Sequence, residues 1–225
     1  MRSDSVFSAS SLQAHLSLVL LCGSALALSI QPASRIATLH ATNASYPSGM
    51  FHLVSVLVFG LFAVSRGAII AAGAPPKIRP LKLVTRLLEH ITYGLLLLLP
   101  FFIFSRALLP GRLAGVAVLV SYVAISSIFY CLISFRLEIR GNRQKRGAFL
   151  LRYGVYAAFC LLPLGVGMSH QSLSLAMCAS PIGFAIQVIR GISATELLLG
   201  FLVPCLGILW LLTRRHGFDR RPHAV

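Results

Sequence analysis

The stretch LAGVAVLVSYVAISSIFYCLISF, residues 113–135, decides the fold class of this chain. It contains no charged residue, and it exceeds the about 20 apolar residues that a helix needs to cross a bilayer. Inside a bilayer no water is present to bond to backbone N–H and C=O groups, so a single spanning segment satisfies them as an α-helix. The stretch therefore predicts a transmembrane helix.

Apolar runs of similar length recur along the whole chain. They cover residues 16–30, 50–72, 87–104, 113–135, 149–168, 173–189 and 197–213. Of the 225 residues, 57% are hydrophobic and 11% are charged, whereas a soluble domain carries about 25% charged residues. This composition excludes a water-soluble globule and leaves no room for a sizeable soluble domain. The sequence predicts an all-α, polytopic membrane protein, a bundle of six to seven transmembrane helices with short loops.

The whole chain is expected to form a single membrane-embedded helical domain. Its first run is either a retained anchor or a cleaved signal peptide, because Ala25-Leu26-Ala27 fits the small-x-small cleavage pattern. Asn43-Ala44-Ser45 matches a glycosylation acceptor in a polar, turn-rich segment, where we expect an ordinary loop. The expected parts are the N-terminal anchor or signal peptide at 1–30, an external loop at 31–49, the helix bundle at 50–213 and a basic tail at 214–225.

Basic residues set the expected orientation in the membrane. Lys and Arg number 20 against 5 Asp and Glu, and they gather between the apolar runs, above all at 77–86 and 136–152. Such clusters are typical of cytoplasmic loops, whereas a nucleic-acid-binding protein carries one basic stripe, so no nucleic-acid partner is expected. We expect a bacterial inner membrane or an equivalent organelle membrane, a cytoplasmic N-terminus, and contact with anionic lipids.

The C-terminal tail conflicts with seven full crossings. Seven crossings place residues 214–225, with four arginines, on the external side. Either one of the last two runs is re-entrant or broken, at Pro181 or Pro204, or the tail tolerates the external side. We prefer the first alternative, because six crossings return the tail to the cytoplasm.

Three ionisable residues near membrane depth, Arg66, Glu89 and His90, are candidate site residues. Glu89 is either an interfacial carboxylate paired with Arg86 or a neighbouring loop cation, which we favour, or a proton or cation site. A charged residue at the bilayer centre costs roughly 2.5 to 3.5 kcal/mol on insertion scales. Arg66 either extends its long side chain to the cytoplasmic interface or forms an ion pair with Glu89 on the neighbouring helix. Glu89, Tyr93 and Pro100 share one helical face, which we expect to look into the bundle.

Two runs carry polar stripes that could line a path or join helices. Tyr122, Ser126, Tyr130 and Ser134 recur at four-residue spacing, and Tyr153, Tyr156 and Cys160 follow one side of the next run. Hydroxyl groups on such stripes bond across helices, at about 0.6 kcal/mol each. The complete set of candidate substrate-binding residues is Arg66, Glu89, His90, Tyr93, Tyr122, Tyr130, Tyr153 and Tyr156.

Neither a metal nor a cofactor is expected from the sequence. All five cysteines lie inside apolar runs, with no CxxC pair and no metal-ligand spacing. A haem would need histidines that face each other at one depth. His15, His52, His90 and His170 lie near the ends of different runs, so the sequence indicates that they are at different levels.

The functional hypotheses follow from these sparse polar residues. HExxH, GxSxG and P-loop motifs are absent, and no catalytic residue is assigned. This favours a non-enzymatic transporter component, or a permease-like subunit of a complex with partner membrane subunits. The alternative is an intramembrane enzyme acting on a lipid or isoprenoid, with Glu89 and His90 as acid and base and Arg66 bound to an anionic head group.

Overall fold

The structure, a computed structural model, describes residues 9–36, 46–73, 80–107, 113–140, 145–169, 177–190 and 192–213. Regular secondary structure in these segments is α-helical, which confirms the predicted all-α class for the described part of the chain. The helices are α1 (Ala9–Ile36), α2 (Tyr46–Gly73), α3 (Pro80–Ala107), α4 (Leu113–Arg140), α5 (Lys145–Ser169), α7 (Pro181–Arg190) and α8 (Ala194–Thr213).

Among the described helices, four are long and apolar enough to cross a bilayer. Their spans are Phe51–Ala72 in α2, Lys82–Ser105 in α3, Ala114–Ile139 in α4 and Ala194–Thr213 in α8. Shorter apolar segments, Leu12–Ala27 and Phe149–Pro163, lie in α1 and α5. The chain is therefore a helical, membrane-embedded protein.

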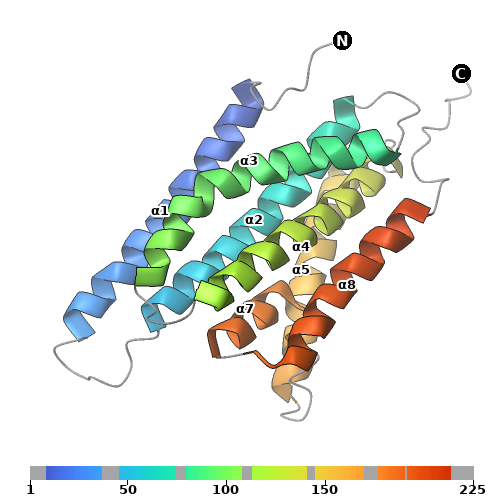
Figure 1. Cartoon of the computed structure of the whole chain (residues 1–225). Helices are drawn as coiled ribbons and strands as arrows, with labels where there is room; N and C mark the ends of the chain where they lie inside the picture. The colour runs from blue at the N-terminus through green and yellow to red at the C-terminus, as the bar shows by residue number, and fades with distance from the viewer. Residues whose placement is uncertain are drawn as a thin grey trace, which may run out of the picture.

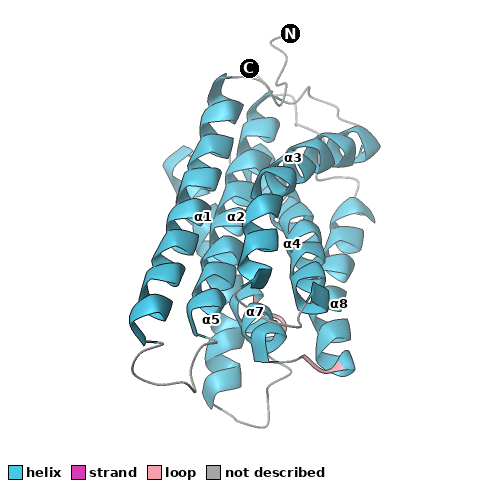
Figure 2. Cartoon of the chain, turned by 60° about the vertical axis from the view of Figure 1, so that its left-hand side comes forward, coloured by secondary structure: helices cyan, strands magenta, loops and turns pink. Residues whose placement is uncertain are grey.

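The helices form one bundle around α2. Helices α1 to α5 run up and down in turn, and α8 brings the chain back to the end of the bundle at which α1 starts (Figure 1). Helix α2 lies inside, in contact with α1, α3, α4, α5 and α7. The view turned by 60° shows the same long helices side by side, with the shorter α7 between them near one end (Figure 2). This arrangement brings α4 against α2, although α3 separates them in sequence.

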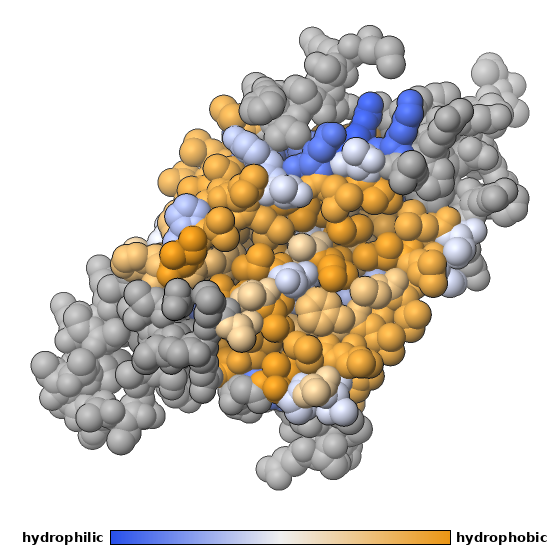
Figure 3. All heavy atoms as spheres, in the orientation of Figure 1, coloured by the Kyte–Doolittle hydropathy of each residue, from blue (hydrophilic) through white to orange (hydrophobic). Residues whose placement is uncertain are grey.

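The outside of the bundle is apolar. Large hydrophobic side chains are exposed on most helices, among them Leu16, Leu96, Ile103, Leu150, Leu162, Leu198 and Trp210. On the face shown in Figure 3, such side chains cover the middle of the molecule, and hydrophilic ones gather towards one end. A belt of this kind suits contact with lipid tails rather than water.

Helix ends differ from those expected. Helix α1 extends to Ile36 and α2 begins at Tyr46, so the loop predicted at 31–49 is wrong at both ends. The helices are longer than the hydrocarbon core is thick. A 28-residue helix such as α1 is about 42 Å long, whereas the core is about 30 Å thick. Polar residues therefore continue a helix beyond the apolar run. Asn43 of the glycosylation acceptor, His170 and the tail at 214–225 lie outside the described residues.

The sixth apolar run is not one long helix. Its helix α7 has 10 residues, about 15 Å, too short to cross a bilayer. Pro181 occupies its first position, where a missing N–H is tolerated, and the carbonyl of Ser180 accepts the first bond, from the N–H of Phe184 at 2.8 Å. The helix thus starts at Pro181, whereas α8 continues through Pro204. Of the two predicted breaks, only the one at Pro181 is seen in the described residues.

A capping box starts α8. The Ser193 N–H donates to Glu196 Oε2 at 2.9 Å, and the Glu196 N–H donates to Ser193 Oγ at 3.3 Å. These reciprocal bonds satisfy helix-end donors that would otherwise lack partners. Ser193 and Glu196 thus define where α8 begins.

Candidate functional site

A buried group of basic and aromatic side chains lies where α1, α2 and α3 meet. We call it the His–Arg cluster: His15 from α1, Phe62 and Arg66 from α2, and His90 and Tyr93 from α3. The exposed fractions of His15, Arg66 and His90 are only 1%, 2% and 5%. Three basic side chains, one from each helix, are thus buried together inside the bundle.

The two histidines define the geometry of the cluster. The ring centroids of His15 and His90 are 6.1 Å apart, and their planes differ by 19°. Phe62 and Tyr93 stand edge-on to His15, with centroid distances of 5.0 Å and 4.9 Å and interplanar angles of 65° and 78°. Arg66 joins the cluster through Phe62, because its Cζ lies 5.2 Å from the ring centroid, within cation–π range.

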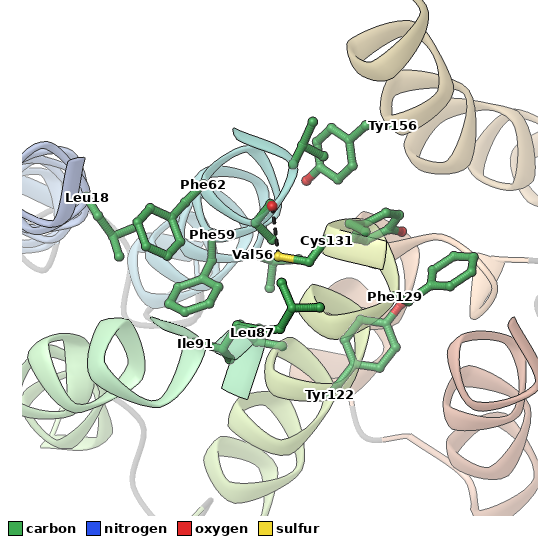
Figure 4. Packing of buried hydrophobic residues seen from close by; sticks show 14 of the residues in the cluster. Leu18, Val56, Phe59, Phe62, Leu87, Ile91, Tyr122, Phe129, Cys131 and Tyr156 are labelled. Atoms are coloured by element: carbon green, nitrogen blue, oxygen red, sulfur yellow. Dashed lines mark hydrogen bonds between the residues drawn. The ribbon is translucent and has the colours of Figure 1, made fainter. Parts of the chain in front are cut away.

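Helical periodicity explains why these side chains point inward. His15 continues a buried stripe of α1 with Leu18 and Cys22, and His90 is next to Ile91 on the buried side of α3. Phe62 points from α2 towards α1, close to Leu18 (Figure 4). His15, Phe62, Arg66 and His90 are buried in the bundle and Tyr93 is half-buried, so side chains from all three helices pack in the cluster.

The expectation that the histidines lie at different levels is wrong for His15 and His90. Helix α1 begins at Ala9 and α3 begins at Pro80, so both helices start several residues before the apolar runs at 16–30 and 87–104. Both histidines therefore lie inside helices, and parallel α1 and α3 bring them to one depth. Sequence reasoning missed His15 as a site residue, because a lone histidine gives no signal of its height relative to another helix.

Glu89 does not belong to the cluster. Its side chain is exposed, as is Pro100, whereas Tyr93 is half-buried and contacts His15, so only Tyr93 of the face predicted to look inward does so. The buried side of α3 instead follows Leu87, Ile91 and Leu98. In the described part of the chain, the structure shows an ion pair between Arg152 and Glu138. It does not show the predicted ion pair between Arg66 and Glu89. Arg66 is 2% exposed, so protein atoms cover its side chain.

A second histidine site lies nearer the opposite end of the bundle. His52 of α2 is 2% exposed and shares a 3.2 Å hydrogen bond between its Nε2 and the Ser105 hydroxyl of α3. Phe51 and Phe102 pack on the His52 ring at centroid distances of 5.4 Å and 6.1 Å. This histidine has a clear structural role, since it ties α2 to α3.

The hydroxyl stripes of α4 and α5 join helices. Ser134 donates to the carbonyl of Val64 at 2.6 Å, and Tyr156 donates to that of Leu57 at 3.1 Å. Between them, the Cys131 thiol donates to the carbonyl of Ala63 at 2.8 Å (Figure 4). All three acceptors are backbone groups of α2, so these residues act as interhelical bonds.

The remaining tyrosines take part in aromatic packing. Tyr122 stacks on Phe184 of α7 at 3.9 Å, and Tyr130 meets Tyr156 edge-on at 4.9 Å. Tyr153 lies 4.7 Å from Phe149 of its own helix. Of the eight candidate residues predicted from the sequence, the structure brings Arg66, His90 and Tyr93 into the His–Arg cluster and places the other five elsewhere.

A row of small residues on α2 lets α4 approach closely. Ala63, Gly67 and Ala71 recur every four residues and are buried. A Cβ added at Gly67 would lie 2.2 Å from the carbonyl oxygen of Cys131. This row could have been found in the sequence, because small residues at four-residue spacing are the signature of close helix packing in membranes.

Comparisons with protein-family models, with curated proteins and with solved structures found no match for this chain. Its function is therefore argued from the His–Arg cluster and its surroundings. Within the described residues, no group of three or more His, Cys, Asp or Glu side chains could hold a metal ion by itself.

Proposed function

We propose that this chain is a transporter component or a permease-like subunit of a membrane complex, and that its His–Arg cluster receives an anionic group of the substrate. The observation that carries the proposal is the joint burial of His15, Arg66 and His90. Ionisable residues inside a membrane bundle are expensive and mark substrate or ion paths. A guanidinium also suits carboxylate or phosphate, because its donors match two oxygens at once.

The proposed threading has six crossings. Helices α1 to α5 and α8 cross, and the short α7 re-enters from the external side; this returns the arginine-rich tail at 214–225 to the cytoplasm beside a cytoplasmic N-terminus. The host membrane is a bacterial inner membrane or an equivalent organelle membrane, with anionic lipids at the basic end. The length of α7 and the shared end of α1 and α8 support this threading (Figure 1).

Cysteine labelling tests the threading. Lys82→Cys, Ser193→Cys and Thr213→Cys occupy exposed positions at the start of α3, before α8 and at the end of α8. In intact cells a membrane-impermeant maleimide should label only Ser193→Cys, and permeabilisation should expose the other two. Labelling of Thr213→Cys in intact cells would instead show a seventh crossing.

An uptake measurement tests the function. Proteoliposomes holding the purified full-length chain would be given radiolabelled inorganic phosphate and a medium-chain carboxylate as anionic probes. We expect uptake of at least one probe, and a loss of about tenfold or more in Arg66→Leu, because a charge-assisted hydrogen bond contributes about 1.5 to 3 kcal/mol. Arg86→Leu is the matched control, since Arg86 is exposed on α3 and should leave uptake unchanged.

The same preparation separates the two functional hypotheses. The enzyme hypothesis needs Glu89 next to His90 at the substrate, yet Glu89 is exposed while His90 is buried in the cluster. Conversion of a lipid or isoprenoid that is abolished by Glu89→Gln would favour the enzyme. Uptake that depends on Arg66 and not on Glu89 supports the transporter, whereas equal uptake by the wild type and Arg66→Leu contradicts the proposed role of the cluster. Uptake only after a partner membrane subunit is added would identify the chain as a subunit of a complex.

A further inference from the structure

We infer that the first half of α3 carries a surface site for the headgroup of a zwitterionic phospholipid with a primary ammonium, of the phosphoethanolamine type. The site is the charged stripe, which we define as Lys82, Arg86 and Glu89 on the outer face of α3. The two cations bind the phosphate, and the carboxylate binds the ammonium. The charged stripe lies outside the His–Arg cluster, so this inference and the proposed function can each fail without the other.

The outward face of α3 changes from polar to apolar along the helix. Its exposed residues are Lys82, Thr85, Arg86, Leu88, Glu89 and Thr92 in the first half, and Leu96, Leu99, Pro100, Ile103 and Phe104 in the second half. The opposite side, with Leu83, Leu87 and Ile91, is buried. A bilayer changes in the same order, from polar headgroups to apolar tails. The first half of this face therefore lies at the level of the headgroups.

The tilt of α3 keeps all three charges at that level. Lys82 and Glu89 are seven residues apart, about 10 Å along a helix, whereas the headgroup layer on each side is about 5 to 8 Å thick. A helix perpendicular to the membrane would carry Glu89 out of this layer. The first part of α3 instead runs obliquely, at the end of the bundle where α1 starts (Figure 1 and Figure 2), and hydrophilic side chains gather at this end (Figure 3).

The charges of the stripe are available to a ligand. In the part of the chain that the structure describes, the ion pair is that of Arg152 with Glu138, so Glu89 forms none there with Lys82 or Arg86. Arg86 and Glu89 are one helical turn apart, a spacing that puts Cβ atoms about 5 to 6 Å from each other. A phosphoethanolamine headgroup carries its phosphate and its ammonium at the two ends of an ethylene link. One headgroup can therefore reach both residues.

The signs of the charges decide between lipid classes. A headgroup with a net negative charge suits Lys82 and Arg86 but is repelled by Glu89. A choline headgroup has a cation without N–H groups, so it cannot donate a hydrogen bond to the carboxylate. A primary ammonium donates such bonds, and its phosphate accepts them from the guanidinium and the lysine ammonium. Of these three headgroups, ethanolamine is the one that satisfies both signs.

The experiment is a lipid titration of the purified full-length protein in detergent, with native mass spectrometry as the readout. The probes are phosphatidylethanolamine and phosphatidylcholine with identical acyl chains, both zwitterionic, so the basic segments of the chain attract them alike. We expect phosphatidylethanolamine to bind about tenfold more tightly, because a charge-assisted hydrogen bond contributes at least that factor. Glu89→Gln should bind the two lipids equally, whereas Lys82→Gln should weaken the binding of both.

Thr85→Val is the matched control, because Thr85 is exposed on the same part of α3 and carries no charge; it should keep the wild-type preference. Phosphatidylglycerol tests the anionic alternative, and it should bind Glu89→Gln more tightly than the wild type, since the repelling carboxylate is gone. Equal binding of the two zwitterionic lipids by the wild type, or a preference that persists in Glu89→Gln, would overturn the inference. So would a protein dimer that Glu89→Gln dissociates, because the carboxylate would then pair with a second copy.

Discussion

Gly67→Ala is expected to destabilise the purified protein by about 3 kcal/mol, the upper end of the range for overpacked cores. The added Cβ would lie 2.2 Å from the Cys131 carbonyl oxygen and 2.9 Å from Ser134 Cβ. A backbone oxygen cannot rotate away as a side chain can, so α4 must move off α2. That movement also stretches the bonds from Cys131 and Ser134 to the carbonyls of Ala63 and Val64.

Gly154→Ala is the control for Gly67→Ala. Both glycines lie inside helices, but a Cβ at Gly154 meets nothing within 4 Å. Alanine should therefore stabilise α5 by roughly 0.5 to 1 kcal/mol through its higher helix propensity. Thermal unfolding of both variants in one detergent provides the measurement. Equal melting temperatures for the two variants would contradict the close approach of α2 and α4.

Phe184→Ala is expected to cost about 3 to 5 kcal/mol, the range for emptying a large aromatic site. Phe184 is fully buried, stacks on Tyr122 at 3.9 Å and meets Phe201 edge-on at 5.7 Å. It thereby holds α7 to both α4 and α8. We expect a lower melting temperature, and faster cleavage by added protease between α7 and α8. The exposed Leu162 gives the control, because Leu162→Ala removes side-chain surface that faces outward.

A double substitution shows whether the cost of Phe184→Ala comes from this contact. A Cβ at Gly200 would lie 2.2 Å from Phe184 Cδ2, so Gly200→Ala alone should also destabilise the protein. Once Phe184 is alanine, that Cβ enters empty space and should recover part of the lost stability. Strictly additive losses in thermal unfolding would mean that α8 does not pack on Phe184.

The features that could be predicted from the sequence are those determined within a single helix, such as its type and its start. The long run at 113–135 gave a correct all-α expectation, and Pro181 marked a real helix start. The apolar runs are shorter than α1 and α3 at both ends of each helix. The reason is that a change from apolar to polar composition marks the membrane boundary and not the helix end. Helix length is set by backbone bonding, which continues past that boundary.

The candidate site was only partly predictable, for a geometric reason. A helical wheel puts Glu89 and Tyr93 on one side of α3, but it cannot say which face of α3 meets the neighbouring helices. In the structure that face is set by Leu87, Ile91 and Leu98, and Glu89 lies outside it. The pairing of His15 with His90 needs both the rotation and the height of two helices, and neither is encoded in the periodicity of one run.

Helices α2 and α4 pack against each other, although they are not synthesised one directly after the other. The ribosome makes α3 between these two helices, so α2 reaches the bilayer before the partner for its small-residue row exists. Ala63, Gly67 and Ala71 tolerate this interval, since they expose no polar side chain to lipid. The donors of the interhelical bonds lie on the later helix, at Cys131 and Ser134. The small-residue row of the earlier helix is thus compatible with lipid before α4 arrives, and the later helix carries the donor groups of both interhelical bonds.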